Sequence, residues 1–189
     1  METCCLMTNA EKILTALDEE LTSRIDLTLY GRAALHLGFP QSPKEHELSR
    51  DVDAVFWMGQ AEELNENTNF WTAVEEINKQ LADHELYISH FFTEDQVILR
   101  PSWRCERVRL PGEWKSLDLY RLADIDLLLS KLMRDDPLDR WDALFIVSAA
   151  NLTIFEIEDA IANARVPDSA EVKEEFELAS RKLLDELKR

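Results

Sequence analysis

Two aspartates, Asp51 and Asp53, open the segment DVDAVFWM (51–58), which otherwise has the composition of a buried strand. Side chains alternate along a strand, so both carboxylates project from the same face. They repel each other there unless a cation is close, and carboxylate oxygens are the ligands that Mg²⁺ prefers. The pair therefore indicates a metal site. The alternative is an ordinary pair of acids at a strand start, with Arg50 neutralising one of them.

A glycine turn precedes this pair in the chain. The stretch LYGRAALHLG (29–38) is typical of a strand that ends at Gly31 and a helix that closes at Gly38. Backbone N–H groups and the positive end of the helix dipole suit a phosphate at such a junction, and Arg32 adds a charge. In the alternative interpretation, Gly31 only permits the backbone to turn.

The elements that must position these residues belong to an α/β (α+β) domain. The chain of 189 residues is 46% apolar, enough for a packed core, and its net charge of −17 disfavours non-specific nucleic-acid binding. Strands are expected at 26–31, 51–58, 86–92, 96–100, 105–110 and 117–122, and helices near 9–21, 32–38, 60–83 with a break around 65–69, 122–132, from 137 on, 153–164 and 168–188. We expect a mixed sheet flanked by helices over residues 1–121, with a C-terminal helical region, 122–189, packed on it.

The cysteine content and hydropathy restrict the class of protein. Cys4, Cys5 and Cys105 form no CxxC pair, so neither a disulfide framework nor a zinc site is indicated, and a reducing cytoplasm fits best. The sequence has no apolar run of about 18 residues and no signal-peptide pattern. We therefore expect a cytoplasmic protein with no membrane partner.

The order strand, glycine turn, helix, then strand with Asp-x-Asp resembles the nucleotidyltransferase (polymerase-β-like) superfamily. It is most similar to bacterial nucleotidyltransferase-like proteins related to AbiEii-type toxins. The stretch YRLADIDLLLSKLMRDDPLDRWDALFIV (120–147) is similar to that family's helix ending in Lys-Leu, polar break and second helix with Arg and Asp. RPSWRCERV (100–108) is similar to a tryptophan–arginine segment of family members. The likeness extends from residue 25 to residue 150, and it implies a nucleotidyltransferase-like mixed sheet.

The resemblance also implies an activity. The chain would be an Mg²⁺-dependent enzyme that moves a nucleotide from an NTP to a hydroxyl of RNA (tRNA) or protein. It would be the toxin of a toxin–antitoxin pair, with a cognate antitoxin as partner. The residues carried over are Asp51 and Asp53 for the metal, with Gly31, Arg32, Lys131, Asp139 and Asp142 for the nucleotide.

Two departures from the family pattern bear on catalysis. The family has a small residue after the first glycine, where this chain has Arg32. Active members carry a third carboxylate on a neighbouring strand, and Glu106 is the expected candidate because it shares a face with Val108 and Leu110. Other candidates are Asp118, Glu94 and Asp95. The alternative function is therefore a catalytically degenerate module that senses nucleotides or binds a protein.

Structural interpretations also exist for the helical residues. Lys131 is placed to form an exposed i,i+4 pair with Asp135, and Asp139 to favour the dipole in a helix first turn. Asp142 flanks an apolar row and needs a partner, either Arg140 or a residue from across the domain junction.

The remaining candidates are a basic segment and the histidines. Residues 100–115 contain four arginines, a lysine and two tryptophans, a composition that can bind an RNA end, although arginines paired with carboxylates and buried tryptophans are favoured. His36, His46, His84 and His90 have no metal-ligand spacing. His36 lies on the helix after Gly31, where it could face a bound nucleotide, but a structural histidine is the favoured interpretation.

Overall fold

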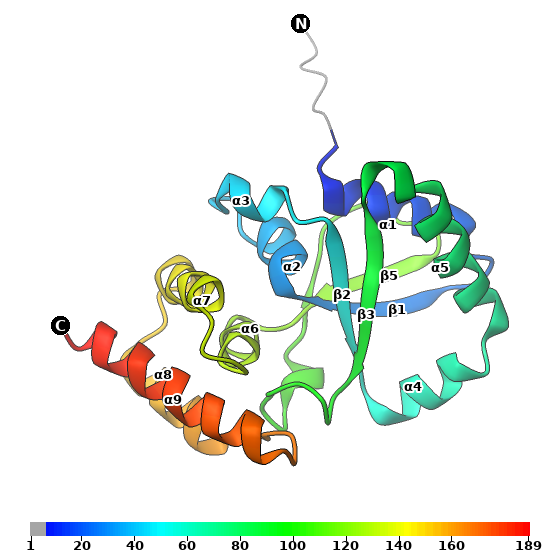
Figure 1. Cartoon of the computed structure of the whole chain (residues 1–189). Coiled ribbons are helices and arrows are strands. Elements are labelled where there is room, and N and C mark those ends of the chain that lie inside the picture. Colours follow the sequence, from blue (N-terminus) through cyan, green and yellow to red (C-terminus); the bar gives the residue numbers. More distant parts are fainter. Residues whose placement is uncertain (1–6) are drawn as a thin grey trace, which may run out of the picture.

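The computed structural model describes residues 7–189. Cys4, Cys5 and the first residues of the expected 1–121 core lie outside this range. The fold class is the predicted one, a mixed sheet flanked by helices and followed by C-terminal helices (Figure 1).

The strands are β1 (Ile25–Tyr30), β2 (Asp51–Phe56), β3 (Tyr87–Thr93), β4 (Val108–Arg109) and β5 (Leu117–Arg121). The helices are α1 (Asn9–Glu20), α2 (Gly31–Gly38), α3 (Lys44–Glu47), α4 (Met58–Asn65), α5 (Thr68–Gln80), α6 (Asp124–Lys131), α7 (Pro137–Ala150), α8 (Ile154–Asn163) and α9 (Ala170–Leu187). Two short 3-10 helices are η1 (Ala82–His84) and η2 (Trp103–Cys105).

Within residues 7–189, the five strands form one sheet in the order β3-β2-β1-β5-β4. The central strand β1 pairs antiparallel with β2 and parallel with β5. Strand β5 is the last of the five in the sequence, so this pairing joins distant segments of the chain. Asp18 of α1 holds the start of β5, since its carboxylate accepts hydrogen bonds from the backbone N–H groups of residues 115, 116 and 117. These contacts fix the start of β5 at the point where Leu117 pairs with Ile25 of β1.

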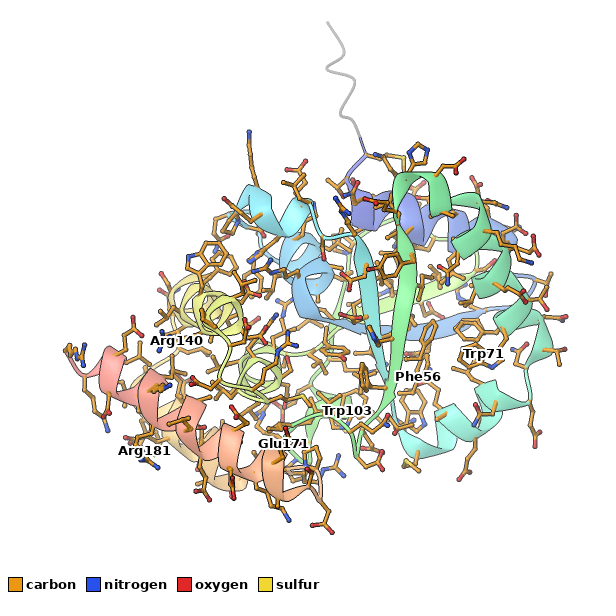
Figure 2. All side chains as sticks on the ribbon, viewed as in Figure 1. Phe56, Trp71, Trp103, Arg140, Glu171 and Arg181 are labelled. Carbon is orange, nitrogen blue, oxygen red and sulfur yellow. The ribbon has the colours of Figure 1, made fainter. Side chains whose placement is uncertain are left out.

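The two faces of the sheet differ in character. Leu27, Leu29, Val52 and Ala54 are fully buried on the face covered by α1, α2 and α5. An aromatic cluster closes the end of this core, where Phe56 stacks on Phe91 with ring centroids 5.4 Å apart. Trp71 of α5 meets the same Phe91 ring edge-on at 5.3 Å, and Figure 2 shows Trp71 on the side of Phe56 that carries α5. The opposite face carries Asp51 and Asp53 together with the fully buried Val55.

Helix starts follow local capping chemistry. Thr8 and Glu11 form the capping box that begins α1, and Thr153 and Glu156 form another at α8. Asp136 caps α7 with Pro137 at its first position, as the DDP sequence predicts. The expected break in the helical region 60–83 is also present, because α4 ends at Asn65 and Asn67 caps α5.

The expected strand at 96–100 is wrong. Val97, Ile98 and Leu99 are buried, but they form an irregular segment with a single bridge, Leu99 to Arg165. The next backbone N–H, that of Arg100, donates to the Asp126 carboxylate at 2.8 Å. An apolar run this short is buried equally well outside a sheet, which is why composition does not decide its conformation. The expected strand 105–110 is likewise reduced to β4.

The C-terminal helices gather to one side of the sheet (Figure 1). Helix α6 contacts α2, α7 and α8, and α9 packs on α7 and α8. Across residues 7–189, no helix combines the length and the apolar character needed to cross a bilayer. The contact of α6 with α2 brings the loop between α6 and α7 over the face of the sheet that carries Asp51 and Asp53.

Candidate functional site

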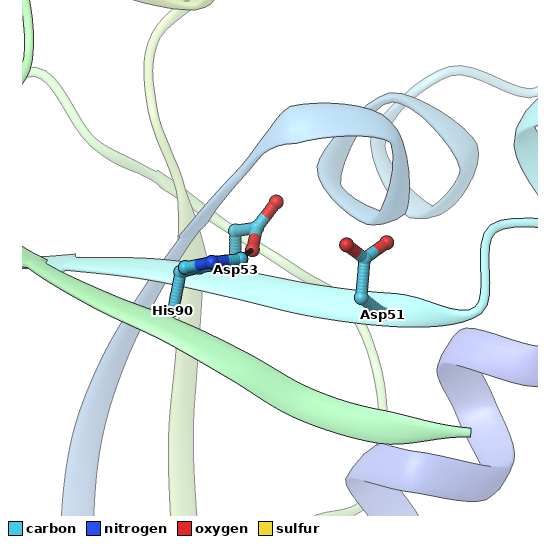
Figure 3. A group of neighbouring side chains, drawn as sticks. All are labelled: Asp51, Asp53 and His90. Atoms are coloured by element: carbon cyan, nitrogen blue, oxygen red, sulfur yellow. Dashed lines mark hydrogen bonds and ion pairs between the residues drawn. The ribbon is translucent and has the colours of Figure 1, made fainter. Parts of the chain in front are cut away.

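Asp51 and Asp53 project from the same face of β2. They alternate with Val52 and Ala54, which are fully buried on the other face. Ser49 Oγ donates a hydrogen bond to Asp51 Oδ1 at 2.9 Å, so the first carboxylate is held in place. Figure 3 shows both carboxylates on one side of the strand. The alternation expected from the sequence therefore does bring two anionic groups to one space.

The neighbouring strand adds His90 to this pair. The register of β2 against β3 shifts between Val52 and Asp53, so that Asp53 lies opposite His90. His90 Nδ1 lies 3.2 Å from Asp53 Oδ1, and one ligand atom each from Asp51, Asp53 and His90 lie within 4.8 Å of one another (Figure 3). Of the residues described, these three form the group with metal-ligand geometry. Sequence reasoning missed His90, because the register shift that selects it leaves no mark in the sequence.

Gly31 ends β1 directly beside these ligands. Its φ of +71° is in the left-handed region that favours glycine. A Cβ at this position would lie 3.0 Å from Asp53 Oδ2, closer than such atoms normally approach. Helix α2 begins at Gly31, and no side chain caps its N-terminus. The glycine thus leaves space for a ligand between the Asp53 carboxylate and a helix start.

One cavity of about 370 Å³ joins this group to the end of α6. Asp51, Asp53 and His90 line one wall, while the other is lined by Lys131, Arg134 and Asp139. An adjoining hollow of about 260 Å³ shares the two β2 aspartates and reaches Arg32. The cavity therefore sets the metal-competent carboxylates opposite two cations, Lys131 and Arg134, that both pair with Asp139.

Lys131 does not form the exposed pair with Asp135 that its spacing predicts. It is buried, and its Nζ lies 3.0 Å from Asp139 Oδ1 and 2.7 Å from Asp142 Oδ2. Asp135 instead pairs with Lys182 of α9. The end of α6 packs against α7, and this tertiary contact outweighs the local i,i+4 geometry.

Asp142 lies behind the cavity at the centre of a buried polar network. Its carboxylate is fully buried and accepts hydrogen bonds from Arg32 Nε at 3.1 Å and from His46 Nε2 at 2.9 Å. His46 Nδ1 lies 2.9 Å from Ser42 Oγ, which fits an imidazole that donates to Asp142 and accepts from Ser42. Burial raises the pKa of Asp142, but the bonds from His46, Arg32 and Lys131 outweigh it and hold that pKa well below its usual range. Asp142 therefore has the partner that was expected from across the domain junction, and that partner is Arg32.

Two further side chains of the cavity, Tyr30 and Arg134, have shifted pKa values. Burial, with the negative charges of Asp53 and Asp51, raises the pKa of Tyr30, so its phenol is neutral at physiological pH. The hydrogen bond to Asp139 raises the pKa of Arg134, whose side chain is 71% exposed. Arg134 is thus a fixed positive charge that remains accessible from the cavity.

The expected third carboxylate does not join the aspartate pair. Glu106 pairs with Arg100 at 2.7 Å and lines a separate hollow beside Asp124. It precedes β4 instead of pointing inward from it. The other candidates are engaged elsewhere: Asp118 with Arg24 and Arg109, Glu94 with Trp103 and Arg165, and Asp95 with Thr93.

Most arginines of the basic segment 100–115 pair with carboxylates, as the favoured structural interpretation predicts. Arg100 pairs with Asp126, Arg107 with Asp26 and Arg109 with Asp118, while Trp103 is buried. Arg104 is the exception in the basic segment: it is exposed, with its guanidinium carbon 3.8 Å from the centroid of the Trp57 ring. Most arginines of the segment are thus neutralised by carboxylates, while Trp103 and Leu110 anchor it in the core.

No family model, curated protein or solved structure matches this chain. The resemblance to the nucleotidyltransferase superfamily, and the toxin–antitoxin setting that it implies, therefore remain predictions. What can be argued about function comes from the cavity itself.

The site brings together five of the residues expected from the sequence: Gly31, Asp51, Asp53, Lys131 and Asp139. Arg32 and Asp142 lie directly behind them, and Glu106 lies apart. The donor set of two carboxylates and one imidazole fits a divalent cation. Chemically, the cavity can accommodate a cation together with a polyanion that bridges its two walls.

Proposed function

We propose that this protein is a nucleotidyltransferase that uses a divalent cation and an NTP to modify a hydroxyl of RNA or protein. One observation carries the proposal: a single cavity contains Asp51 and Asp53 on one wall and Lys131 and Arg134 on the other. A metal-bound triphosphate has the complementary distribution of charge, with a cation to face the carboxylates and anionic oxygens to face the lysine and the arginine.

In the proposed reaction, the acceptor oxygen forms a bond to the α-phosphorus and the bond to the pyrophosphate oxygen breaks. Asp51 and Asp53 hold the cation, which when bound neutralises charge that develops on the phosphate oxygens. Asp53, whose side chain is 22% exposed, takes the hydroxyl proton. Arg134 and Lys131 face the departing pyrophosphate, and Gly31 lets the α2 N-terminus approach the phosphates.

The test is transfer of label from α-labelled NTPs to total tRNA and to protein acceptors in the presence of Mg²⁺ or Mn²⁺. Wild type should label one acceptor class, and the double variant Asp51→Ala/Asp53→Ala should not. Asp83→Ala, which removes an exposed acid of η1 away from the cavity, is the matched control and should behave as wild type. Equal labelling by wild type and the double variant would overturn the proposed mechanism.

A second candidate function is a nucleotide-sensing or protein-interaction module with the same fold. The observation that favours it is that Arg32 pairs with Asp142, and Lys131 with both Asp139 and Asp142. These ion pairs offset the positive charge that would bind a triphosphate. Calorimetric titration with each of the four NTPs separates the cases. Binding without transfer to any acceptor supports a sensor, and the absence of binding supports an interaction module.

A further inference from the structure

The metal-competent group is not built from oxygen ligands alone. His90 contributes an imidazole nitrogen beside the carboxylates of Asp51 and Asp53. Mg²⁺ prefers oxygen ligands and keeps much of its water, whereas imidazole suits first-row transition cations. The identity of the third ligand therefore bears directly on which cation the site selects.

The fold directs His90 to this place. The register shift between Val52 and Asp53 sets His90 opposite Asp53, where an unshifted β3 would present the preceding residue. Such irregularities commonly re-aim a side chain beside a functional site. The shift thus brings the nitrogen donor to the site and interrupts the regular pairing of β2 with β3.

A neighbouring ring fixes the orientation of the imidazole. The Phe92 ring stacks on His90 with centroids 5.4 Å apart and an angle of 23° between the planes. Phe92 is itself held edge-on by Tyr30 at 6.0 Å. With its ring supported in this way, His90 directs Nδ1 toward Asp53 Oδ1 at 3.2 Å. A bound cation placed between these two atoms would replace that contact with two coordination bonds.

We infer that the site selects a first-row transition cation, Mn²⁺ in particular, over Mg²⁺, and that His90 is the nitrogen ligand responsible. Mn²⁺ shares with Mg²⁺ the carboxylate ligands and the octahedral geometry, and as a first-row transition cation it binds a nitrogen ligand more readily than Mg²⁺ does. The inference rests on the proposed function, because it assumes that Asp51 and Asp53 hold a divalent cation. It departs from the expectation of Mg²⁺ that follows from the two aspartates alone.

Metal binding tests the inference without any activity measurement. Affinities for Mn²⁺ are measured from the loss of the free-ion signal in electron paramagnetic resonance, and those for Mg²⁺ by competition. Wild type is compared with His90→Asp, which replaces the nitrogen donor with a carboxylate that suits both ions. The ratio of Mn²⁺ to Mg²⁺ affinity should fall roughly tenfold in His90→Asp. His84→Asp changes an exposed histidine of η1 outside the cavity and should keep the wild-type ratio.

A spectroscopic measurement identifies the ligand itself. Pulsed electron paramagnetic resonance of bound Mn²⁺ should detect a directly coordinated ¹⁴N nucleus in wild type and in His84→Asp, and none in His90→Asp. An unchanged affinity ratio, or the absence of the nitrogen coupling in wild type, would overturn this inference and leave the proposed function standing. If wild type binds neither cation, both the inference and the metal-dependent function fail together.

Discussion

The ammonium of Lys131 lies 2.7 Å from the carboxylate of Asp142, which has no exposed surface. This contact links the cavity to the buried network behind it, because the same lysine reaches Asp139 on the cavity wall at 3.0 Å. A cation in this position can stabilise the fold and also contribute to the ligand binding proposed for the cavity. Its neighbours therefore allow the two contributions to be separated experimentally.

Replacing Asp142 should destabilise the fold strongly. Asp142→Asn removes the negative charge that balances Arg32 and Lys131; it breaks the ion pair with Arg32 and leaves the buried Lys131 with Asp139 alone. The free energy of unfolding should fall by about 3–5 kcal/mol, the range for breaking a buried ion pair. Urea denaturation measures this loss. Asp118→Asn breaks an exposed pair with Arg24 and should leave the midpoint nearly unchanged. Equal effects of the two variants would contradict the assignment.

The contribution of Asp142 should depend on pH in the acid range. Its pKa in the folded protein lies below the ordinary value of 3.8, so the folded state binds fewer protons than the unfolded state between the two values. The stabilisation is fully present above the ordinary pKa and is lost as the pH falls toward the folded one.

The measurement compares wild type with Asp142→Asn in urea over a pH series. The difference in unfolding free energy should stay constant from neutral pH to about pH 5 and then shrink by about 1.4 kcal/mol per pH unit. A difference that grows on acidification would show that Asp142 is not the group responsible.

Gly31→Ala should strain the site, since φ at this position is +71° and the new Cβ would lie 3.0 Å from Asp53 Oδ2. We expect a loss of about 1–2 kcal/mol in unfolding free energy from the backbone alone, together with weaker metal binding. Gly59→Ala offers a control of opposite sign. Gly59 lies in α4, where a Cβ would meet the Trp57 ring at an ordinary contact distance of 3.8 Å, and alanine there should stabilise by up to about 1 kcal/mol. Thermal denaturation distinguishes the two.

Arg134→Gln should reduce nucleotide binding without harming the fold. The Arg134 side chain is 71% exposed and lines the cavity, so its loss removes a charged contact to phosphate and little packing. NTP affinity, measured by calorimetry, should fall about tenfold. Lys173→Gln, an exposed lysine of α9 that pairs with Asp168, is the matched control. An unchanged affinity in Arg134→Gln would remove Arg134 from the proposed site.

Features set by local chemistry were predictable from the sequence. The strand that ends at Gly31, the strand that begins at Asp51, and the start of α7 at Asp136 and Pro137 all follow from turn, alternation and capping rules. Two carboxylates facing one space also follow, because strand periodicity fixes their common face.

Features set by contacts between distant segments were not predictable. His90 enters the site through a register shift, and register depends on how two strands pack, not on the composition of either. Lys131 looks like an exposed helix residue until α7 covers it and supplies Asp139. Arg32 resembles a phosphate ligand in sequence, yet its guanidinium is held by Asp142 from the C-terminal helices.

The parallel pairing of β1 with β5 has a consequence for how the chain acquires its fold. Ile25 lies beside Leu117, so the edge of β1 opposite β2 stays unpaired until the polypeptide has been made well past the middle of its length. Such non-local pairing slows folding, and an unpaired strand edge invites association with other chains. During synthesis, the nascent chain is therefore most prone to aggregation before β5 has emerged. Shortened chains that stop before residue 117 should be insoluble.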